Sequence, residues 1–207
     1  LVMVAGGKYT TYRVMARDAV DAVAHGLDQL VPPSCTDRIP LLGADGYPAL
    51  WNARYRIAER AGLHVARIEH LLHRYGSLID EVLDLIEADR SLAEPLDGAD
   101  DYLRAEIVYA ATHEGARHLE DVLSRRTRIS IETFHRGTGV AQEVAELLAG
   151  PLGWDGDQIK REVEYYAKRV EAERLSQEQD TDQEADAIRL GAPEIVPVAV
   201  PGRRSVS

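Results

Sequence analysis

Helical spacing of apolar residues extends from Ala49 to Ser176 and constrains the fold of this chain more than any other feature. Apolar side chains recur there every three or four positions, which places them on one face of a helix. Gly62 and Gly76 follow two of these runs, at positions where helices commonly end. We therefore predict an all-α domain of six to eight helices over residues 49–175. The expected helices are 50–61, 64–75, 78–86, 100–113, 119–125, 129–135, 140–148 and 155–174.

Two helix starts carry local capping signals. Ser77 precedes an apolar run and is expected to cap its helix. Asp155 and Gln158 have the spacing of a capping box, and Trp154 is placed to pack on Ile159 as a hydrophobic staple.

The N-terminal segment has a different pattern, typical of a strand, a glycine turn and a helix. Residues 2–5 are apolar, Gly6 and Gly7 follow, and helical spacing runs from Thr10 to Gly26. Such a turn directs backbone N–H groups and the positive end of a helix toward an electron-rich group. A strand needs neighbouring strands. We therefore expect that this chain is a fragment, and that residues 1–26 are the last strand, turn and helix of a domain whose other parts it lacks.

A linker and a tail flank the helical region. Residues 27–48 contain four prolines and two glycines and favour an irregular but packed linker. Residues 176–207 are first acidic and then proline-rich, which predicts a solvated tail. The alternative is an extended strip that docks through Ile195, Val196, Val198 and Val200.

Composition excludes several classes of protein. The formal net charge of -11 argues against broad binding of nucleic acid, because phosphates attract basic surfaces. The single cysteine, Cys35, has no partner for an internal disulfide, which fits a reducing compartment. No apolar run approaches the roughly 20 residues of a transmembrane helix.

Common motifs fit this chain poorly. The segment around Lys8 is not a nucleotide P-loop, because Val2 stands where glycine is required and Tyr9 where serine or threonine is required. His113 and His118 are one position too far apart for a zinc-protease motif. His70 and His73 share a helix face without a convincing third ligand, which is more typical of a surface or an interface.

The basic cluster Arg125-Arg126-Thr127-Arg128 has two interpretations. It could bind a phosphate. We favour ion pairing instead, because basic side chains near a helix C-terminus suit the helix dipole and commonly pair across a domain interface.

Several motifs together resemble one family, the flavin-dependent (respiratory, quinone-linked) glycerol-3-phosphate dehydrogenases. The matching segments are AGGKYTTYRVMA at 5–16, PLLGADGY at 40–47, HLLHRYGSLIDEVL at 70–83, YLRAEIVYAATHEGARHLEDVLSRRTRI at 102–129 and LGWD at 152–155. They occur in the expected order over about residues 3–174. Residues 176–207 match nothing in the family.

The resemblance implies a large FAD-binding domain followed by a small all-helical C-terminal domain. It places Gly6, Gly7, Thr10 and Thr11 along the pyrimidine edge of the flavin. Lys8 would face the flavin and the substrate beside it, and it is the one residue for which we predict a catalytic role. A helix N-terminus and an ammonium group lower the energy of negative charge that develops on a bound cofactor.

The family reaction converts sn-glycerol 3-phosphate to dihydroxyacetone phosphate and passes electrons from FAD to membrane quinone. The resemblance thus implies a cytoplasmic enzyme bound peripherally to the inner face of the cytoplasmic membrane. The fragment alone should be inactive, because the remaining FAD- and substrate-binding residues belong to the missing flavin domain. A homodimer is a further expectation.

Two other hypotheses remain open. The helical region is alternatively a non-catalytic interaction module for domain packing, oligomerisation or partner docking. An unrelated all-α adaptor is the third possibility, and it requires the ordered motif matches to be coincidental.

Overall fold

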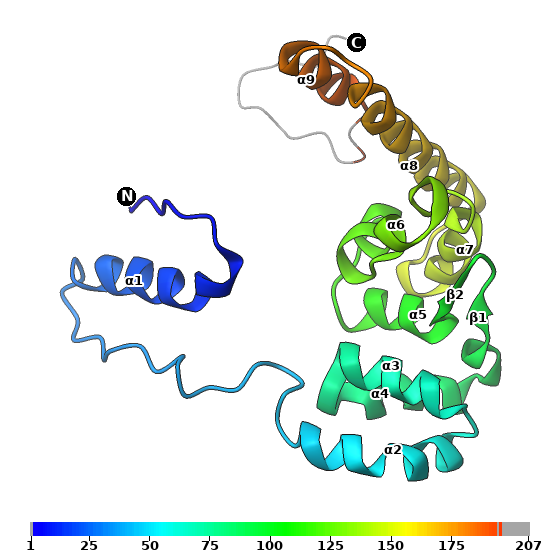
Figure 1. Cartoon of the computed structure of the whole chain (residues 1–207), viewed down its shortest axis with the longest axis horizontal. Helices are drawn as coiled ribbons and strands as arrows, with labels where there is room; N and C mark the ends of the chain where they lie inside the picture. Colours follow the sequence, from blue (N-terminus) through cyan, green and yellow to red (C-terminus); the bar gives the residue numbers. More distant parts are fainter. Residues whose placement is uncertain (1, 194, 196–207) are drawn as a thin grey trace.

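The structure, a computed structural model, describes residues 2–193 and residue 195. Figure 1 shows α1 (Tyr12–Ala24) standing apart from a larger helical unit, with an extended segment joining the two. The predicted all-α class is confirmed, since the only sheet among these residues is a two-stranded hairpin. The helices of the larger unit are α2 (Tyr47–Ala61), α3 (Val65–Tyr75), α4 (Ile79–Ala88), α5 (Arg104–Thr112), α6 (Ile129–Glu132), α7 (Ala141–Leu152), α8 (Gly156–Ser176) and α9 (Asp182–Gly191).

Two hydrophobic cores hold the helical unit together. The first core lies among α2, α3, α4 and α5 and includes the fully buried Ile68 and Ile79. The second core lies among α5, α7, α8 and the segment 116–129, and includes Leu119 and Val144. The apolar face predicted for α4 is confirmed, because its side chains at 79, 82, 83 and 86 are all buried in the first core.

Helix α5 belongs to both cores. Ala105 and Tyr109 face the first core, whereas Ile107 and Ala110 face the second. A helix with apolar residues on opposite faces must be covered on both of them. Helix α5 is therefore the central element around which the unit is built.

The start of the predicted helix 100–113 is wrong. Residues Ala99–Leu103 form strand β2, which pairs antiparallel with β1 (Pro95–Leu96). The two strands flank Asp97-Gly98, a dipeptide that favours hairpin turns. This turn signal outweighs the helical spacing, and the helix begins only at Arg104.

The two predicted caps have different outcomes. Asp155 caps α8 as expected, because its carboxylate accepts a hydrogen bond of 2.8 Å from the Gln158 N–H. Ser77 does not cap α4. It lies within a turn of 3-10 helix, Gly76–Leu78, and its own N–H donates to the Gly43 carbonyl at 2.8 Å.

The strand expected over residues 2–5 is absent. These residues have no regular secondary structure and are exposed to solvent. A strand requires hydrogen-bonding neighbours, and the hairpin β1–β2 offers them none. The helix that follows is present as a 3-10 turn, Tyr9–Thr11, that continues directly into α1.

The prediction of a solvated tail is wrong for residues 182–191, which form α9 and pack against α8. Ala185 is buried, and Arg189 donates a hydrogen bond of 3.1 Å to Ser176. Of the proposed docking strip, Ile195 lines a small hollow beside α8. Val196, Val198 and Val200 lie outside the described residues. Within residues 2–193, no helix combines the length and apolar character needed to cross a membrane.

Candidate functional site

The segment Gly6–Thr11 forms an exposed turn at the N-terminal end of α1. The Lys8 carbonyl accepts hydrogen bonds from the Thr11 N–H at 3.0 Å and from the Thr11 hydroxyl at 2.8 Å. Thr11 therefore closes the turn as a donor and does not cap the helix as an acceptor. This arrangement brings all five predicted site residues, Gly6, Gly7, Lys8, Thr10 and Thr11, into one short stretch of exposed backbone.

The two glycines of this turn are not required by the packing of the chain itself. A Cβ atom added to Gly7 would meet nothing within 4 Å. One added to Gly6 would meet only the flexible side chain of Met15, at 2.4 Å from its sulfur. The backbone at Gly7 is thus open to close approach by a flat group from outside the chain, and at Gly6 only the flexible Met15 side chain stands in the way.

The electrostatics of the turn favour a group that carries negative charge. Backbone N–H groups in the first turn of a helix have no acceptor within the helix, and they form its positive end. The Lys8 side chain is exposed and makes no ion pair with any residue from 2 to 193. Its ammonium group is available to a bound anion or to an electron-rich ring.

The basic cluster Arg125–Arg128 is paired within the helical unit, as the favoured interpretation predicts. Arg125 contacts the carboxylates of Glu120 at 2.8 Å and Asp121 at 3.0 Å. Arg128 lies 3.4 Å from Glu132, and the Arg126 side chain donates to a backbone carbonyl at 2.8 Å. These pairs are local and do not cross a domain interface.

The two histidines of the zinc-like motif lie against different neighbours. The ring of His113 stacks on Tyr109 with centroids 4.6 Å apart. The Nδ1 atom of His118 lies 2.9 Å from the carboxylate of Glu162, which is fully buried. Glu162 also accepts from the Leu119 N–H at 3.0 Å, so this carboxylate anchors α8 to the segment before the π-helical turn Asp121–Arg126.

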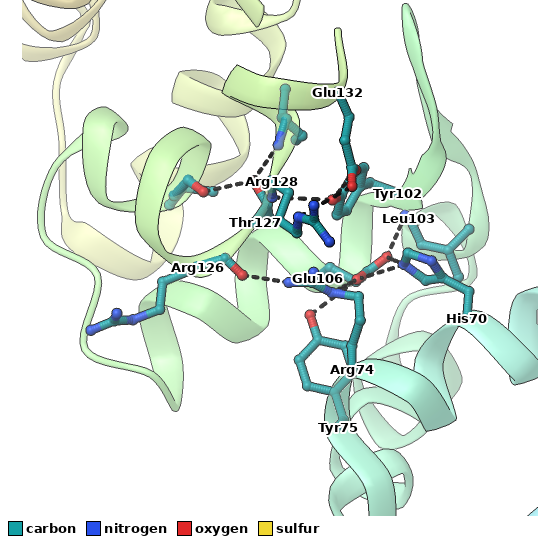
Figure 2. A network of polar contacts seen from close by, with 12 residues as sticks. His70, Arg74, Tyr75, Tyr102, Leu103, Glu106, Arg126, Thr127, Arg128 and Glu132 are labelled. Atoms are coloured by element: carbon teal, nitrogen blue, oxygen red, sulfur yellow. Dashed lines mark hydrogen bonds and ion pairs between the residues drawn. The ribbon is translucent and has the colours of Figure 1, made fainter. Parts of the chain in front are cut away.

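A buried carboxylate that the sequence patterns did not predict, Glu106, lies at the centre of the helical unit (Figure 2). Its Oε1 atom accepts from the Leu103 N–H at 2.9 Å and lies 3.1 Å from His70 Nε2. Its Oε2 atom accepts from the Tyr75 hydroxyl at 3.1 Å and lies 3.0 Å from Arg74 Nε. Burial, together with the negative charge of Glu106, raises the pKa of Tyr75 well above its ordinary value.

The network around Glu106 continues to the basic cluster. Arg74 donates to the Arg126 carbonyl, and its guanidinium lies 5.1 Å from the centre of the Tyr102 ring. The Tyr102 hydroxyl donates to Glu132 at 2.7 Å and accepts from the Arg128 N–H at 3.1 Å (Figure 2). Burial, together with the bond to Glu132, raises the pKa of Tyr102 to about 12.

This network is structural rather than catalytic. Glu106 has an exposed fraction of 0%, so no substrate can reach its carboxylate. Its contacts join α3, β2, α5 and the segment 126–132 into one body. A glutamate directly between Ala105 and Ile107, at the start of the apolar run 107–111, was the available sequence signal.

Fold and site together define a class: a helical domain built around a buried polar hub, preceded by an exposed glycine–lysine turn. Residues 34–159 match the family described as the C-terminal domain of alpha-glycerophosphate oxidase. The chain therefore belongs to this family.

Curated relatives extend the match beyond that range. The chain is 55% identical over 194 residues to glycerol-3-phosphate dehydrogenase 2 of Mycobacterium tuberculosis, which covers 94% of this chain and 33% of the relative. It is 53% identical over 194 residues to glycerol-3-phosphate dehydrogenase of Mycobacterium leprae, with the same coverage of 94% and 33%. A mitochondrial glycerol-3-phosphate dehydrogenase of Arabidopsis thaliana is 33% identical over 178 residues, covering 79% of this chain and 28% of the relative.

The chain spans about a third of the length of these mycobacterial relatives. No solved structure matches it significantly.

Proposed function

We propose that the protein containing this chain oxidises sn-glycerol 3-phosphate to dihydroxyacetone phosphate, with hydride transfer to FAD and electron transfer to membrane quinone. The support is the combination of high identity to glycerol-3-phosphate dehydrogenases over 94% of the chain with the open turn at Gly6–Thr11. The remainder of the flavin site would come from the enzyme's N-terminal flavin domain. The enzyme would act in the cytoplasm, peripherally bound to the inner face of the cytoplasmic membrane, where it meets quinone.

In this proposal the N-terminal turn binds the flavin ring and stabilises the negative charge that develops there. FAD itself would accept the hydride. Gly6 and Gly7 allow the backbone to approach the ring closely, and the Thr10 N–H donates to it, since the Thr11 N–H is already bonded to the Lys8 carbonyl. Lys8 holds a positive charge beside the ring and the substrate, where negative charge develops in the reaction. The observation that carries this assignment is the exposed Lys8 side chain, which makes no ion pair with residues 2–193.

The helical unit, residues 47–193, has a second and non-catalytic role in this proposal. Its charged side chains at the polar hub and at the basic cluster are already paired with one another. We therefore assign it to packing, oligomerisation or partner docking, including a homodimer, and give it no catalytic residue.

A spectrum of the intact protein tests the activity directly. The full open reading frame around this chain should purify with a flavin absorption band, and that band should bleach when glycerol 3-phosphate is added without air. A colourless protein, or a flavin that glycerol 3-phosphate leaves oxidised, would refute the proposed reaction.

Replacement of the lysine tests the role of the turn. In the intact enzyme, Lys8→Ala should lower kcat at least tenfold, which corresponds to about 1.4 kcal/mol of transition-state stabilisation. Lys160→Ala, at an exposed position of α8, is the matched control and should retain full turnover. Near-normal kcat for Lys8→Ala would remove Lys8 from the reaction.

A further inference from the structure

The segment after α1 folds back along that helix. Figure 1 shows it returning beneath α1 toward the end that carries the Gly6–Thr11 turn, before it continues to α2. Arg13, in the first turn of α1, is half-buried and donates through Nη1 to the Thr36 carbonyl and, at 2.9 Å, to the Ile39 carbonyl. One guanidinium group thus fixes the segment 36–39 beside the start of α1.

A second attachment follows only four residues later. The Gly43 carbonyl accepts a hydrogen bond of 2.8 Å from the Ser77 N–H. Gly43 and Gly76 also lie in direct contact, since a Cβ atom added to Gly76 would stand 1.9 Å from the Gly43 oxygen. The linker is therefore held to the helical unit at the turn between α3 and α4.

These two attachments leave very little free chain between them. Only Pro40, Leu41 and Leu42 separate Ile39 from Gly43. Four residue steps span at most about 14 Å when fully extended. A linker that looks long in sequence is thus a short strap between the Lys8 turn and the helical unit.

We propose that Arg13 is a positioning residue, which holds the Lys8 turn at a fixed separation from the helical unit by clamping the linker. Without this clamp, all of the linker from His25 to Gly43 separates α1 from the second attachment, and the start of α1 loses its fixed distance from Gly76. The inference rests on the proposed function in one respect: the purpose of the fixed separation is to place Lys8 beside the flavin.

The chain offers a matched control one helical turn further along. Arg17 is exposed, and its guanidinium pairs with the adjacent Asp18 at 2.9 Å. It makes no hydrogen bond to the linker among the residues from 2 to 193. Arg17→Met therefore removes an arginine from the same helix and keeps both hydrogen bonds of Arg13. It removes only the ion pair with Asp18 and the charge attraction of Arg17 to Asp21 and to Asp37 of the linker.

Trypsin cleavage after Arg38 measures the clamp itself. Arg38 lies between the two carbonyl acceptors, and its side chain has an exposed fraction of 80%. In the intact protein, Arg13→Met should speed cleavage at this site at least about fivefold, because both hydrogen bonds that order the segment are lost. Arg13→Lys, which keeps a charged donor, should cleave at an intermediate rate, and Arg17→Met at the unchanged rate. Equal cleavage rates in Arg13→Met and Arg17→Met would overturn the clamp.

Kinetics of the intact enzyme measure the positioning. Arg13→Met should lower kcat about tenfold with a change in KM below about twofold, because the substrate still binds while Lys8 is displaced. Arg13→Lys should recover part of kcat. Faster cleavage with unchanged kcat would overturn the positioning role. An intact protein that neither holds flavin nor oxidises glycerol 3-phosphate would refute the proposed function, and the cleavage rates would still decide the clamp.

Discussion

At the scale of single residues, the hub at Glu106 shows how a charge can be kept inside a small helical domain. A carboxylate removed from water is costly unless partners replace its hydration. Glu106 has a backbone N–H, a histidine ring, a tyrosine hydroxyl and an arginine within 3.1 Å. Each partner comes from a segment that must be correctly placed, so the hub favours one packing of α3 against α5.

The tyrosines of this hub make stability depend on alkaline pH. Burial and the bond to Glu132 raise the pKa of Tyr102 from about 10 to about 12. A tyrosine that binds its proton more tightly when folded contributes stability that is complete below pH 10 and is lost as pH rises through 12. Between pH 9 and 12, the free energy of unfolding of Tyr102→Phe should fall by about 1–2 kcal/mol less than that of the wild type, as measured by urea unfolding.

The comparison concerns the pH dependence and not the absolute stability, because Tyr102→Phe also removes two hydrogen bonds. Tyr55→Phe, at an exposed position of α2, is the control and should keep the wild-type dependence. An identical alkaline loss in Tyr102→Phe and the wild type would contradict the assignment.

At the scale of elements, most of what the sequence predicted came from apolar spacing, and most errors came from competing local signals. The helix ends at Gly62 and Gly76 and the Asp155 cap are correct. The strand β2 was missed because Asp97-Gly98 sets a hairpin within helix-like spacing. Helix α9 was missed although Thr181 accepts from the Glu184 N–H at 3.2 Å, a capping-box spacing that is readable in the sequence.

The candidate site and the hub also differ in how far the sequence could predict them. The Gly6–Thr11 turn could be found because its residues are consecutive. The Glu106 hub could not be assembled, because His70 and Glu106 are 36 positions apart and only the packing of α3 on α5 joins them.

The contact between Gly43 and Gly76 is the most demanding junction between elements. Gly76 has a φ of +56°, which disfavours any side chain, and its Cα faces the Gly43 oxygen. Gly76→Ala should lower the free energy of unfolding by at least about 3 kcal/mol, measured by urea denaturation, because both strain and a backbone clash result.

Gly150→Ala supplies the control for this substitution. Gly150 lies within α7, and a Cβ atom added there meets nothing within 4 Å. This variant should be neutral or more stable by up to about 1 kcal/mol. Equal stability of Gly76→Ala and the wild type would mean that the segments around Gly43 and Gly76 separate readily.

At the scale of the whole molecule, the burial of side chains is confined to the helical unit. No described residue from 2 to 56 is buried, whereas both cores lie between Ile57 and Tyr166. On α1, apolar side chains such as Val20 and Val23 are exposed. The N-terminal part thus contributes very little hydrophobic stabilisation, and the roles that we propose for it are those of a binding site and a clamp.

Removal of residues 1–39 should therefore leave the helical unit intact. Its free energy of unfolding in urea should stay within about 0.5 kcal/mol of the value for the full chain. Removal of residues 177–207 is the contrasting variant, because it takes away α9 with the buried Ala185 and should lower stability. A loss above about 2 kcal/mol on removing residues 1–39 would show that the N-terminal part supports the fold.

The position of α5 between the two cores has a consequence for cooperativity. Tyr109 packs into one core and Ile107 into the other, so α5 supplies packing partners to both. If either core becomes disordered and α5 moves, the other core loses part of its packing. We therefore expect the two halves of the helical unit to melt in a single transition, so that a destabilising substitution in either half lowers the stability of both.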